Sequence, residues 1–555
     1  MEDRNRSLDR SPRAVACVLL SSVFGPYCQD DSYGSRAINP MELFHNQVTR
    51  EQGSFSLRAF HPSLGIRLIQ ENISAPCTVL DFPTLEAFEH EITKHVYDII
   101  GISSIVANVG KVKKMCEVAR ALSPRSRIVV GGHVAAIQGL HTMVDADDVV
   151  KGEGVAWMRE LLGEDAQAPI RHPAVSSSFG FRFMGLPIPI PRAANPAVVA
   201  PSVGCPLGCD FCCTSAFFGG KGKVHSFFKD GDELFDALCA IDAQLHSSAF
   251  FMLDENFLLH RDRALQLLAR MRKQDKSWVF YVFSSANAIA QYSVETLVEL
   301  GVSWIWLGLE SAGSDYKKLK NTDTVDMVRR LHEHGIATIG SSIIGLPHHT
   351  AANVREDIEY AISHETDFHQ FMLYTPMPGT PLHAKSLAED SLLSEVPYAD
   401  SHGQFKFNFR HPNISRDESK LLLDSAFRRD YERNGPSVYR LFKTMHAGWQ
   451  RHAEHPDPRV RRRFRRDRLI FRPLIEASLR AMEYTLALEN QTSARQRVRA
   501  LRQQIDVGSG GVGRWIGLTG ASVLMAASLV ERLGIARASM YEPRMQVERR
   551  NWEIP

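Results

Sequence analysis

Four of the nine cysteines in this chain stand within nine positions, at Cys205, Cys209, Cys212 and Cys213. Thiolates on one loop with the spacing of Cys205, Cys209 and Cys212 can wrap a metal cluster and leave one iron without a protein ligand. Soft thiolates select iron–sulfur clusters or zinc. A structural zinc site would take a fourth protein ligand, for which Cys213 or His225 is available. Adjacent residues such as Cys212 and Cys213 seldom both face one metal, so the pattern favours a cluster over zinc.

The cysteine segment directly follows the first of six predicted strands, which alternate with helical patterns. The strands cover 197–202, 249–253, 278–283, 304–308, 336–344 and 368–373, and the helical patterns cover about 232–245, 262–272, 294–300, 324–334 and 351–364. Such alternation predicts a parallel sheet. Six repeats are fewer than the eight that close a full barrel, so we predict a partial, open barrel over 197–385. Active sites of such barrels lie at the carboxyl ends of the strands, where the cysteines stand.

An earlier alternation, over residues 1–163, predicts a doubly wound, Rossmann-like parallel sheet. Short apolar runs without polar alternation read as buried parallel strands. They lie at 14–20, 78–82, 98–103, 127–130 and 148–150, with helical patterns at 85–95 and 112–122. The polar, Gly-containing stretch 24–58 fits neither pattern and is interpreted as a lid or an insertion.

Two further regions complete the expected α/β organisation. Residues 164–196 are rich in proline and form an extended linker. Residues 386–555 are rich in Arg, Ala, Leu and Glu and are predicted to form a mostly helical C-terminal domain with a loose end.

Composition excludes several classes of protein. The net charge of +2 argues against bulk attraction to nucleic acid. The scattered cysteines do not resemble a secreted disulfide framework, which favours a reducing, cytoplasmic location. The first 13 residues are charged and lack the apolar core of a signal peptide. The longest apolar run, 515–530, is shorter than the ~20 residues that span a bilayer, so we expect a soluble protein.

Two C-terminal features leave alternatives open. Eight arginines between Arg459 and Arg472 could bind nucleic acid, anionic lipid or phosphate, or form a solvated helix face. The 515–530 run is interpreted as a buried core helix, with contact to a membrane or a lipid tail as the alternative. These features keep peripheral membrane contact and a lipid substrate among the hypotheses.

The motif Cys-x3-Cys-x2-Cys, with Phe211 before the last cysteine, resembles the signature of the radical S-adenosylmethionine superfamily. The resemblance implies a 4Fe-4S cluster on Cys205, Cys209 and Cys212, whose open iron binds the amino and carboxylate groups of S-adenosylmethionine. It also implies a partial barrel of six strand–helix repeats, in agreement with the count above. Reductive cleavage of the cofactor to a 5′-deoxyadenosyl radical would need an electron donor such as ferredoxin or flavodoxin.

The same resemblance assigns contacts to S-adenosylmethionine at the strand ends. Asp254 and Glu255 match the position that receives the methionine amino group, although they depart from the Gly-Gly-Glu form of that motif. Their structural alternative is a helix N-cap with favourable charge. The full set of expected contacts is Phe211, Asp254, Glu255, Ser284, Glu310, Ser311, Ile343 and Gly345.

The segment 374–382 resembles one found in members that carry an N-terminal cobalamin-binding domain. Glycines at the strand ends of the first sheet would let the backbone approach a flat macrocycle. The expected cobalamin contacts are Ser103, Ser104, Gly131, Gly132, His133, Gly152 and Glu153. The Asp-x-His-x-x-Gly motif that supplies a cobalt ligand in many cobalamin proteins is missing after the first strand, and His133 is interpreted as a loop residue. The alternative is a vestigial sheet without a cofactor.

Three functions remain from these observations. The first is cobalamin-dependent radical methylation of an unactivated carbon in a small-molecule or lipid substrate. The second keeps the radical but couples carbons or closes a ring. The third is a non-catalytic iron–sulfur or cobalamin-binding sensor or electron carrier, against which the acidic and ribose-type motifs argue.

Overall fold

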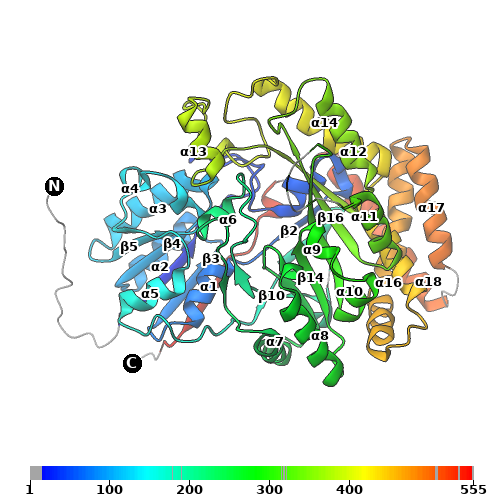
Figure 1. Ribbon diagram of the computed structural model, residues 1–555, viewed down its shortest axis with the longest axis horizontal. Coiled ribbons are helices and arrows are strands. Elements are labelled where there is room, and N and C mark those ends of the chain that lie inside the picture. The colour runs from blue at the N-terminus through cyan, green and yellow to red at the C-terminus, as the bar shows by residue number, and fades with distance from the viewer. Residues whose placement is uncertain are drawn as a thin grey trace.

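The computed structural model describes residues 16–552, except 178, 189, 314–315, 317–318, 320–321, 507–510 and 536–537. Two sheets with flanking helices lie side by side, and a group of long helices packs against the second sheet (Figure 1). The predicted mixed α/β fold with parallel sheets and a helical C-terminal region is confirmed. The first 15 residues, which include the charged N-terminal segment, lie outside the described residues.

The first sheet has six strands in the order β18-β3-β1-β4-β5-β6. Its predicted strands are β1 (Val18–Ser22), β3 (Cys77–Asp81), β4 (Ile99–Ser103), β5 (Arg127–Gly131) and β6 (Asp148–Val149), all mutually parallel. Helix α2 (Leu85–Lys94) crosses from β3 to β4, on either side of β1, and α3 (Val109–Leu122) connects the neighbouring strands β4 and β5. Because the strands are parallel, their carboxyl ends share one edge, which brings Ser103 beside Gly131.

The second sheet has seven strands in the order β17-β16-β15-β14-β13-β10-β7. Six are parallel: β10 (Ala197–Val199), β13 (Ala249–Met252), β14 (Val279–Ser284), β15 (Val302–Glu310), β16 (Ala337–Ile344) and β17 (Phe368–Leu373). The short β7 (Val175–Ser176) from the linker pairs antiparallel with β10. The six predicted strands are confirmed, and their sequential order is compatible with the expected partial barrel.

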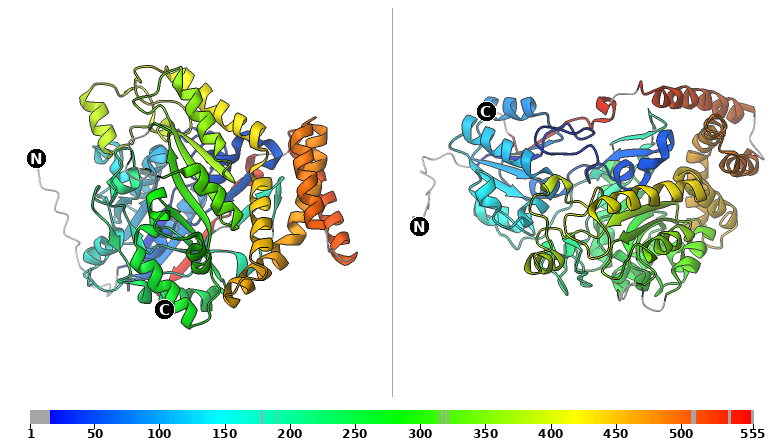
Figure 2. Two further views of the ribbon diagram at one scale, coloured as in Figure 1. Left: turned by 45° about the vertical axis from the view of Figure 1, so that its right-hand side comes forward. Right: turned by 90° about the horizontal axis from the view of Figure 1, so that it is seen from above.

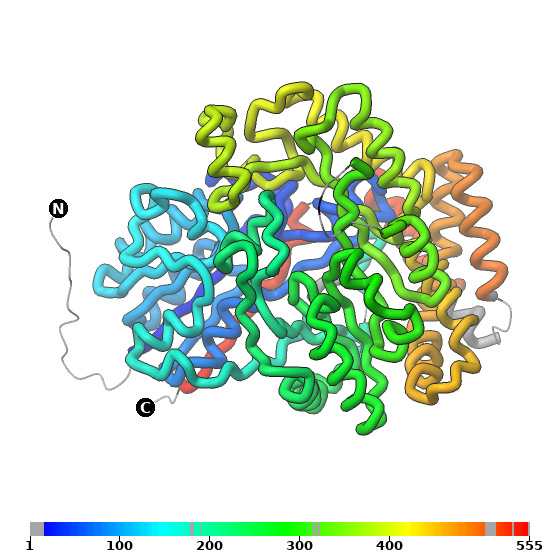
Figure 3. Tube along the Cα trace, in the orientation of Figure 1, coloured from blue at the N-terminus to red at the C-terminus, as the bar shows by residue number. Residues whose placement is uncertain are grey.

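Helices connect the consecutive strands of the second sheet and cover one of its faces (Figure 3). They are α7 (Gly231–Leu245), α8 (Arg261–Lys273), α10 (Val294–Leu300), α11 (Thr324–Glu333) and α12 (Asn353–Ser363). Several begin at capping side chains: Asp230, Ser293 and Asp323 each accept a hydrogen bond from a backbone N–H of the first turn. Phe250, Phe280 and Ile305 are fully buried in the core of this unit.

The polar stretch 24–58 is a buried connection and not a lid. It contains two short helices, η1 (His45–Thr49) and η2 (Arg50–Phe55), and leads into β2 (Leu57–Phe60), which pairs with β8 (Phe179–Phe183). The Gln370 side-chain amide on β17 donates to the Gln47 amide oxygen at 2.6 Å. Polar side chains in this stretch therefore serve internal hydrogen bonds, which explains why hydrophobic periodicity did not reveal its place.

The C-terminal region is helical as expected but ends in a strand. Its long helices are α14 (Arg416–Asn434), α15 (Ser437–Arg451), α16 (Pro458–Leu488), α17 (Thr492–Asp506) and α18 (Gly511–Arg532). After them β18 (Gln546–Arg550) joins the first sheet, antiparallel to β3. The C-terminus therefore lies beside the N-terminal unit (Figure 1). The expectation of a loose end is wrong for residues 546–550.

The arginine-rich segment starts α16, and its arginines are divided between the interior and the surface. Arg463 is 2% exposed and donates to the Val298 carbonyl at 2.7 Å. Arg459 pairs with Asp457 at 2.6 Å, and Arg472 pairs with Glu476 at 2.8 Å. These contacts favour a structural role over an anion-binding surface.

The apolar run 515–530 forms most of α18, and the side chains of 515–517 lie outside the described residues. Ala521, Leu524 and Ser528 are buried, whereas Val523 is 54% exposed and Leu529 is 45% exposed. The helix is therefore half-buried, which corrects the expectation of a core helix. Among the described residues, no helix has both the length and the hydropathy needed to cross a membrane. Figure 2 shows α18 at the outer side of the helical group.

We predict that Glu542→Ala will weaken the first unit. The Glu542 carboxylate accepts from the backbone N–H of Tyr27 at 2.8 Å and of Cys28 at 2.9 Å, just before β18 begins. Leaving these donors unpaired should cost about 1–3 kcal/mol. Thermal unfolding should show a drop of several degrees, and amide exchange in β1 and β3 should accelerate. Glu395 is exposed, so Glu395→Ala is the control and should change neither the unfolding temperature nor the amide exchange. Equal unfolding temperatures and exchange rates in the two variants would contradict the prediction.

Candidate functional site

The cysteine loop leaves the second sheet between two very short strands, β11 (Ser202–Val203) and β12 (His225–Ser226), which pair antiparallel. Gly208 has φ +60°, and a Cβ there would overlap Lys221, so the close approach of these segments requires glycine. The Ser215 hydroxyl donates to the Cys205 carbonyl at 3.0 Å. These contacts fix the loop that carries the three cysteines.

Asp210, inside the cysteine motif, ties the loop to two distant segments. Its carboxylate accepts from the Tyr316 hydroxyl at 3.1 Å and from the Tyr374 hydroxyl at 2.8 Å. Phe211 packs edge-to-face against Tyr316, with ring centroids 5.3 Å apart, and against Tyr374 at 6.3 Å. Asp210 lies inside the cysteine motif and Tyr374 is the first residue of the 374–382 segment, and their spacing in the sequence could not reveal this contact.

The spacing of the cysteine sulfurs bears on the zinc alternative. Cys213 begins α6 (Cys213–Phe217), and burial raises the pKa of its thiol. Within the described part of the chain, the cysteine sulfurs are not among the ligand atoms that gather within 4.8 Å of one another as ligands of one ion do. Widely spaced thiols suit a cluster, in which each cysteine binds a different iron.

Glu255 faces the cysteine loop with a carboxylate oxygen that has no partner. Its Oε2 is buried and accepts no hydrogen bond among the described residues. Burial raises the pKa of Glu255 to about 7, although hydrogen bonds from its own backbone and that of Gly204 lower it. A buried acceptor beside the first cysteine fits the expected role of binding the amino group of S-adenosylmethionine.

Asp254 holds the loop rather than facing an open space. Its carboxylate accepts from the Ser202 hydroxyl at 2.7 Å, from the Asn256 backbone N–H at 3.1 Å and from the Arg263 guanidinium. Asp254 is 1% exposed. This geometry gives the carboxylate a positioning role and does not favour the direct cofactor contact that we expected.

Ser284 lies at the end of β14, as expected, and is held by Asn256. The Asn256 side-chain oxygen accepts from the Ser284 hydroxyl at 3.1 Å and from the Ser285 backbone N–H at 3.0 Å. Asn256 thus links the acidic turn after β13 to the end of β14. The sequence analysis gave Asn256 no role.

Glu310 and Ser311 lie where β15 ends, at an irregularity in its pairing with β16. Glu310 is buried and has φ +53°, an unusual backbone conformation for a residue with a side chain. Such strain is often found at ligand-binding sites, so it supports Glu310 as an expected contact to S-adenosylmethionine. The Ser311 hydroxyl donates to Asp357 and lies 3.1 Å from His348 Nε2.

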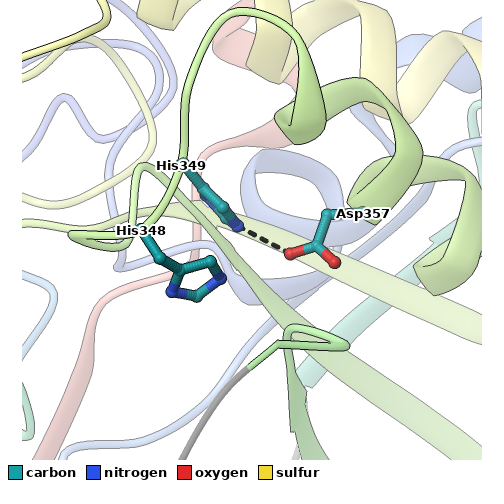
Figure 4. Close-up of side chains that lie close together, drawn as sticks. All are labelled: His348, His349 and Asp357. Atoms are coloured by element: carbon teal, nitrogen blue, oxygen red, sulfur yellow. Dashed lines mark hydrogen bonds and ion pairs between the residues drawn. The ribbon is translucent and has the colours of Figure 1, made fainter.

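A histidine–aspartate pair supports the turn at Gly345, which is an expected contact of S-adenosylmethionine. His349 Nδ1 accepts from the backbone N–H of Gly345 at 2.9 Å and of Leu346 at 3.2 Å, so its Nε2 carries the proton. Nε2 donates to Asp357 at 2.6 Å (Figure 4). Burial raises the pKa of Asp357, but the hydrogen bonds from His349 and Ser311 outweigh it and lower the pKa overall.

His348, His349 and Asp357 form the one group in the described residues whose ligand atoms lie close enough to hold a single ion. Both nitrogens of His349 already take part in hydrogen bonds, which leaves it no lone pair for a metal. The group is therefore a hydrogen-bond network that joins Ser311 to Gly345. Ile343, by contrast, belongs to an apolar cluster and is 8% exposed.

The expected cobalamin residues lie at the shared edge of the first sheet. Gly132 has φ +78°, and a Cβ there would come within 2.5 Å of the Ser104 carbonyl oxygen. Gly152, at the next strand end, has no atom within 4 Å of where a Cβ would lie, which leaves open space beside the backbone. His133 Nε2 is buried and has no hydrogen-bond partner among the described residues, and burial lowers its pKa. These features fit a polar ligand at this edge.

Glu153 differs from the expectation. Both of its carboxylate oxygens cap α5 (Gly154–Leu162), accepting from the backbone N–H of Val155 at 2.6 Å and of Ala156 at 2.8 Å. The carboxylate is therefore committed to the helix start.

The edge of the first sheet meets the cysteine loop directly. The His133 ring stacks on Phe217 of α6, with centroids 4.7 Å apart and planes at 26°. A Cβ at Gly379, in the 374–382 segment, would lie 3.1 Å from Ala136, three residues after His133. Three motifs that are far apart in the sequence therefore converge at one place.

Comparison with protein families finds two matches. Residues 199–361 match the model of the radical SAM superfamily, and residues 55–162 match that of the B12 binding domain. The first match covers the sheet that carries the cysteines, and the second covers the edge that carries Ser103, Gly132 and His133.

Curated relatives are similar to this chain over about half of its length. An uncharacterized methyltransferase of Pyrococcus horikoshii is 27% identical over 55% of this chain and 72% of its own length. The bacteriochlorophyllide d C-12(1)-methyltransferase of Chlorobaculum tepidum is 24% identical over 51% of this chain and 65% of its own. The anaerobic magnesium-protoporphyrin IX monomethyl ester cyclase of Rubrivivax gelatinosus is 23% identical over 53% and 59%.

A solved structure has the same fold. It is the radical S-adenosylmethionine methyltransferase TsrM of Kitasatospora setae, described with cobalamin and a 4Fe-4S cluster bound. The likeness has a TM-score of 0.51 and 16% identity, and covers 81% of this chain and 99% of that one.

We predict that binding of S-adenosylmethionine will depend on the charge of Glu255. The pKa of about 7 means that its carboxylate gains charge as the pH rises from 6 to 8. Because the amino group of S-adenosylmethionine donates a stronger hydrogen bond to a charged carboxylate, the Kd should be about tenfold weaker at pH 6 than at pH 8. The Glu255→Gln variant should bind S-adenosylmethionine weakly at both pH values. Equilibrium binding to the cluster-loaded protein measures this, and a wild-type Kd that does not change with pH would contradict it.

Proposed function

Because this chain belongs to the radical S-adenosylmethionine superfamily, in the branch with an N-terminal B12-binding domain, we propose that it is a cobalamin-dependent radical methylase. The observation that carries the proposal is the stacking of His133 on Phe217. It brings the strand ends of the B12-binding unit against the helix that continues the cysteine loop. A methyl carrier and a radical source have to reach the same carbon, and this contact brings their expected sites together.

The residues present fit the implied cofactors. Cys205, Cys209 and Cys212 would hold a 4Fe-4S cluster on a loop fixed by Gly208 and Asp210. The expected contacts to S-adenosylmethionine that the geometry supports are Glu255, Ser284, Glu310, Ser311 and Gly345. The expected cobalamin contacts that it supports are Ser103, Ser104, Gly131, Gly132, His133 and Gly152.

When bound, these cofactors supply a 5′-deoxyadenosyl radical, which removes a hydrogen atom, and a transferable methyl group. The chain's own residues bind and orient. Glu255 would accept a hydrogen bond from the amino group, and the network of Asp357, His349 and Ser311 keeps the turn at Gly345 in place. The half-buried loop and the His133–Phe217 contact limit the access of water.

We propose four functional units: residues 1–163, 164–196, 197–385 and 386–555. Strand β18 is assigned to the first unit, although it lies in the last part of the sequence. The substrate is a small molecule, and an electron donor such as a ferredoxin or flavodoxin would reduce the cluster. Radical coupling or cyclisation is the second candidate, because a cyclase is among the relatives.

We predict that the protein purified without oxygen contains about four irons, and that the triple Cys205/Cys209/Cys212→Ala variant contains none. Cys213→Ala is the matched control and should keep its iron, because Cys213 lies outside the Cys-x3-Cys-x2-Cys motif. Iron, sulfide and zinc are measured in the same samples. Addition of a reductant and S-adenosylmethionine should release 5′-deoxyadenosine only from proteins that contain iron.

Each outcome separates the candidate functions. Zinc in place of iron would overturn the proposal that this protein is a radical enzyme. A cluster without release of 5′-deoxyadenosine would favour a sensor or an electron carrier. Release without methylated product would favour coupling or cyclisation.

We predict that about one corrinoid binds per chain and that Gly132→Ala loses it. The added Cβ would approach the Ser104 carbonyl and disturb the strand ends at which the corrinoid is expected to bind. Gly163→Ala is the control: it also has positive φ, at +74°, but a Cβ there meets no atom within 4 Å. Absorbance and corrinoid analysis measure binding. Full occupancy in Gly132→Ala, or no corrinoid in the wild type, would contradict the prediction.

A further inference from the structure

A cavity of about 230 Å³ lies at the second sheet, enclosed between strands β13 to β16 and helices α15 and α16. This volume is many times the ~15 Å³ that one water molecule needs. Aromatic side chains dominate the part of the wall that the sheet and the helices provide. They include Phe251, Tyr281, Trp304, Trp306, Phe442 and Phe471.

No residue described along this wall has an ionised side chain. Aspartate, glutamate, lysine and arginine are all missing from its lining. A charged group buried there would lack a counter-ion, which costs several kcal/mol. The cavity therefore excludes ions and favours an uncharged molecule.

Two residues that line the cavity each carry a buried polar atom without a partner in the described structure. The Ser478 hydroxyl on α16 is buried and unpaired, and Ser478 is 0% exposed. His61 Nε2 is also buried and unpaired, while His61 Nδ1 donates to the Ser177 carbonyl at 2.6 Å. Because burial lowers the pKa of His61, its ring stays neutral and Nε2 is a hydrogen-bond acceptor.

The wall of the cavity leads toward the expected site of chemistry. Phe251 on β13 stands four residues before Glu255, and Val282 on β14 stands two residues before Ser284. Trp306 on β15 precedes Glu310 by four residues. The same three strands thus line the cavity along their length and carry the expected cofactor contacts at their carboxyl ends.

We propose that this cavity binds an uncharged, mostly apolar molecule through one hydroxyl or N–H group, which donates to His61 Nε2, with Ser478 as a second polar contact. The inference rests on the proposed function in one respect: the bound molecule is the substrate. Its apolar body would lie along the inner side of the strands whose ends carry the expected cofactor contacts. Apolar cavities of proteins stay dry and take up apolar ligands, which supplies the driving force.

The probe for this site is N-phenyl-1-naphthylamine, a neutral aromatic molecule with one N–H group, added to the cluster-loaded full-length protein. Binding is followed by probe fluorescence and by quenching of the tryptophans. Met445 lines the cavity from α15, so Met445→Trp should fill it and weaken probe binding at least tenfold. Met327→Trp, a partly buried methionine on α11 outside the cavity, is the matched control and should bind as the wild type does. Thermal unfolding of both variants shows that they are folded.

A second variant tests the hydrogen bond and does not depend on filling the cavity. His61→Phe keeps a ring but removes the acceptor, so it should bind the naphthylamine about five- to tenfold more weakly. Competition by 1-benzylnaphthalene, in which a CH2 replaces the N–H, should be unchanged in this variant. An equal loss for both ligands would overturn the assignment of His61.

The outcomes distinguish this inference from the proposed function. No binding to the wild type, or equal binding to Met445→Trp, would overturn the cavity as a ligand site whatever the enzyme activity. Probe binding by a protein that does not cleave S-adenosylmethionine would leave the cavity standing and overturn the radical chemistry alone.

Discussion

The carboxylate of Asp210 determines where the cysteine loop can lie, and much of the site depends on it. It accepts hydroxyl hydrogen bonds from Tyr316, which follows β15, and from Tyr374, which follows β17. Hydrogen bonds to a charged acceptor are stronger than those between neutral groups. The loop is therefore joined to two strand ends on the side of the sheet away from β10, from which it starts. A loop that carries three thiols can keep its shape before any metal binds because of these contacts.

Side-chain hydrogen bonds also join the other strand ends of the second sheet to one another. Asn256 joins the turn after β13 to Ser284 and Ser285, and the pair His349 and Asp357 joins Ser311 to the turn at Gly345. Asp254 is saturated by three donors, whereas the neighbouring Glu255 keeps one oxygen open toward the loop. These neighbouring acidic residues therefore differ in their contacts: the Asp254 carboxylate is occupied by protein donors, and Glu255 has one oxygen without a partner among the described residues.

Local pattern predicted the strands of both sheets well, because buried parallel strands are continuous apolar runs with clear helical segments between them. The spacing of the cysteines and the acidic pair after β13 are visible in the sequence, and their roles stay predictions. The contacts of Asp254 and Glu153 are not visible there, because a capping or ion-paired carboxylate has the same sequence pattern as a ligand-binding one. Hydrogen bonds also give roles to Asp210, Asn256 and His349. The partners of Asp210 and Asn256 are distant in the chain, and those of His349 are brought close by a turn and the helix after it. Residues 24–58 and β18 are polar, and pairing with distant segments decides their structure.

The pairing of β18 with β3 has a consequence for the synthesis of this protein. Nearly 470 residues separate Asp81, at the end of β3, from Gln546, so the edge of the first sheet stays uncovered while the rest of the chain leaves the ribosome. An open edge strand is a template for pairing with other chains. The N-terminal unit therefore has to wait for the last residues of the chain before its edge is protected, and chains that terminate early would present that edge to one another.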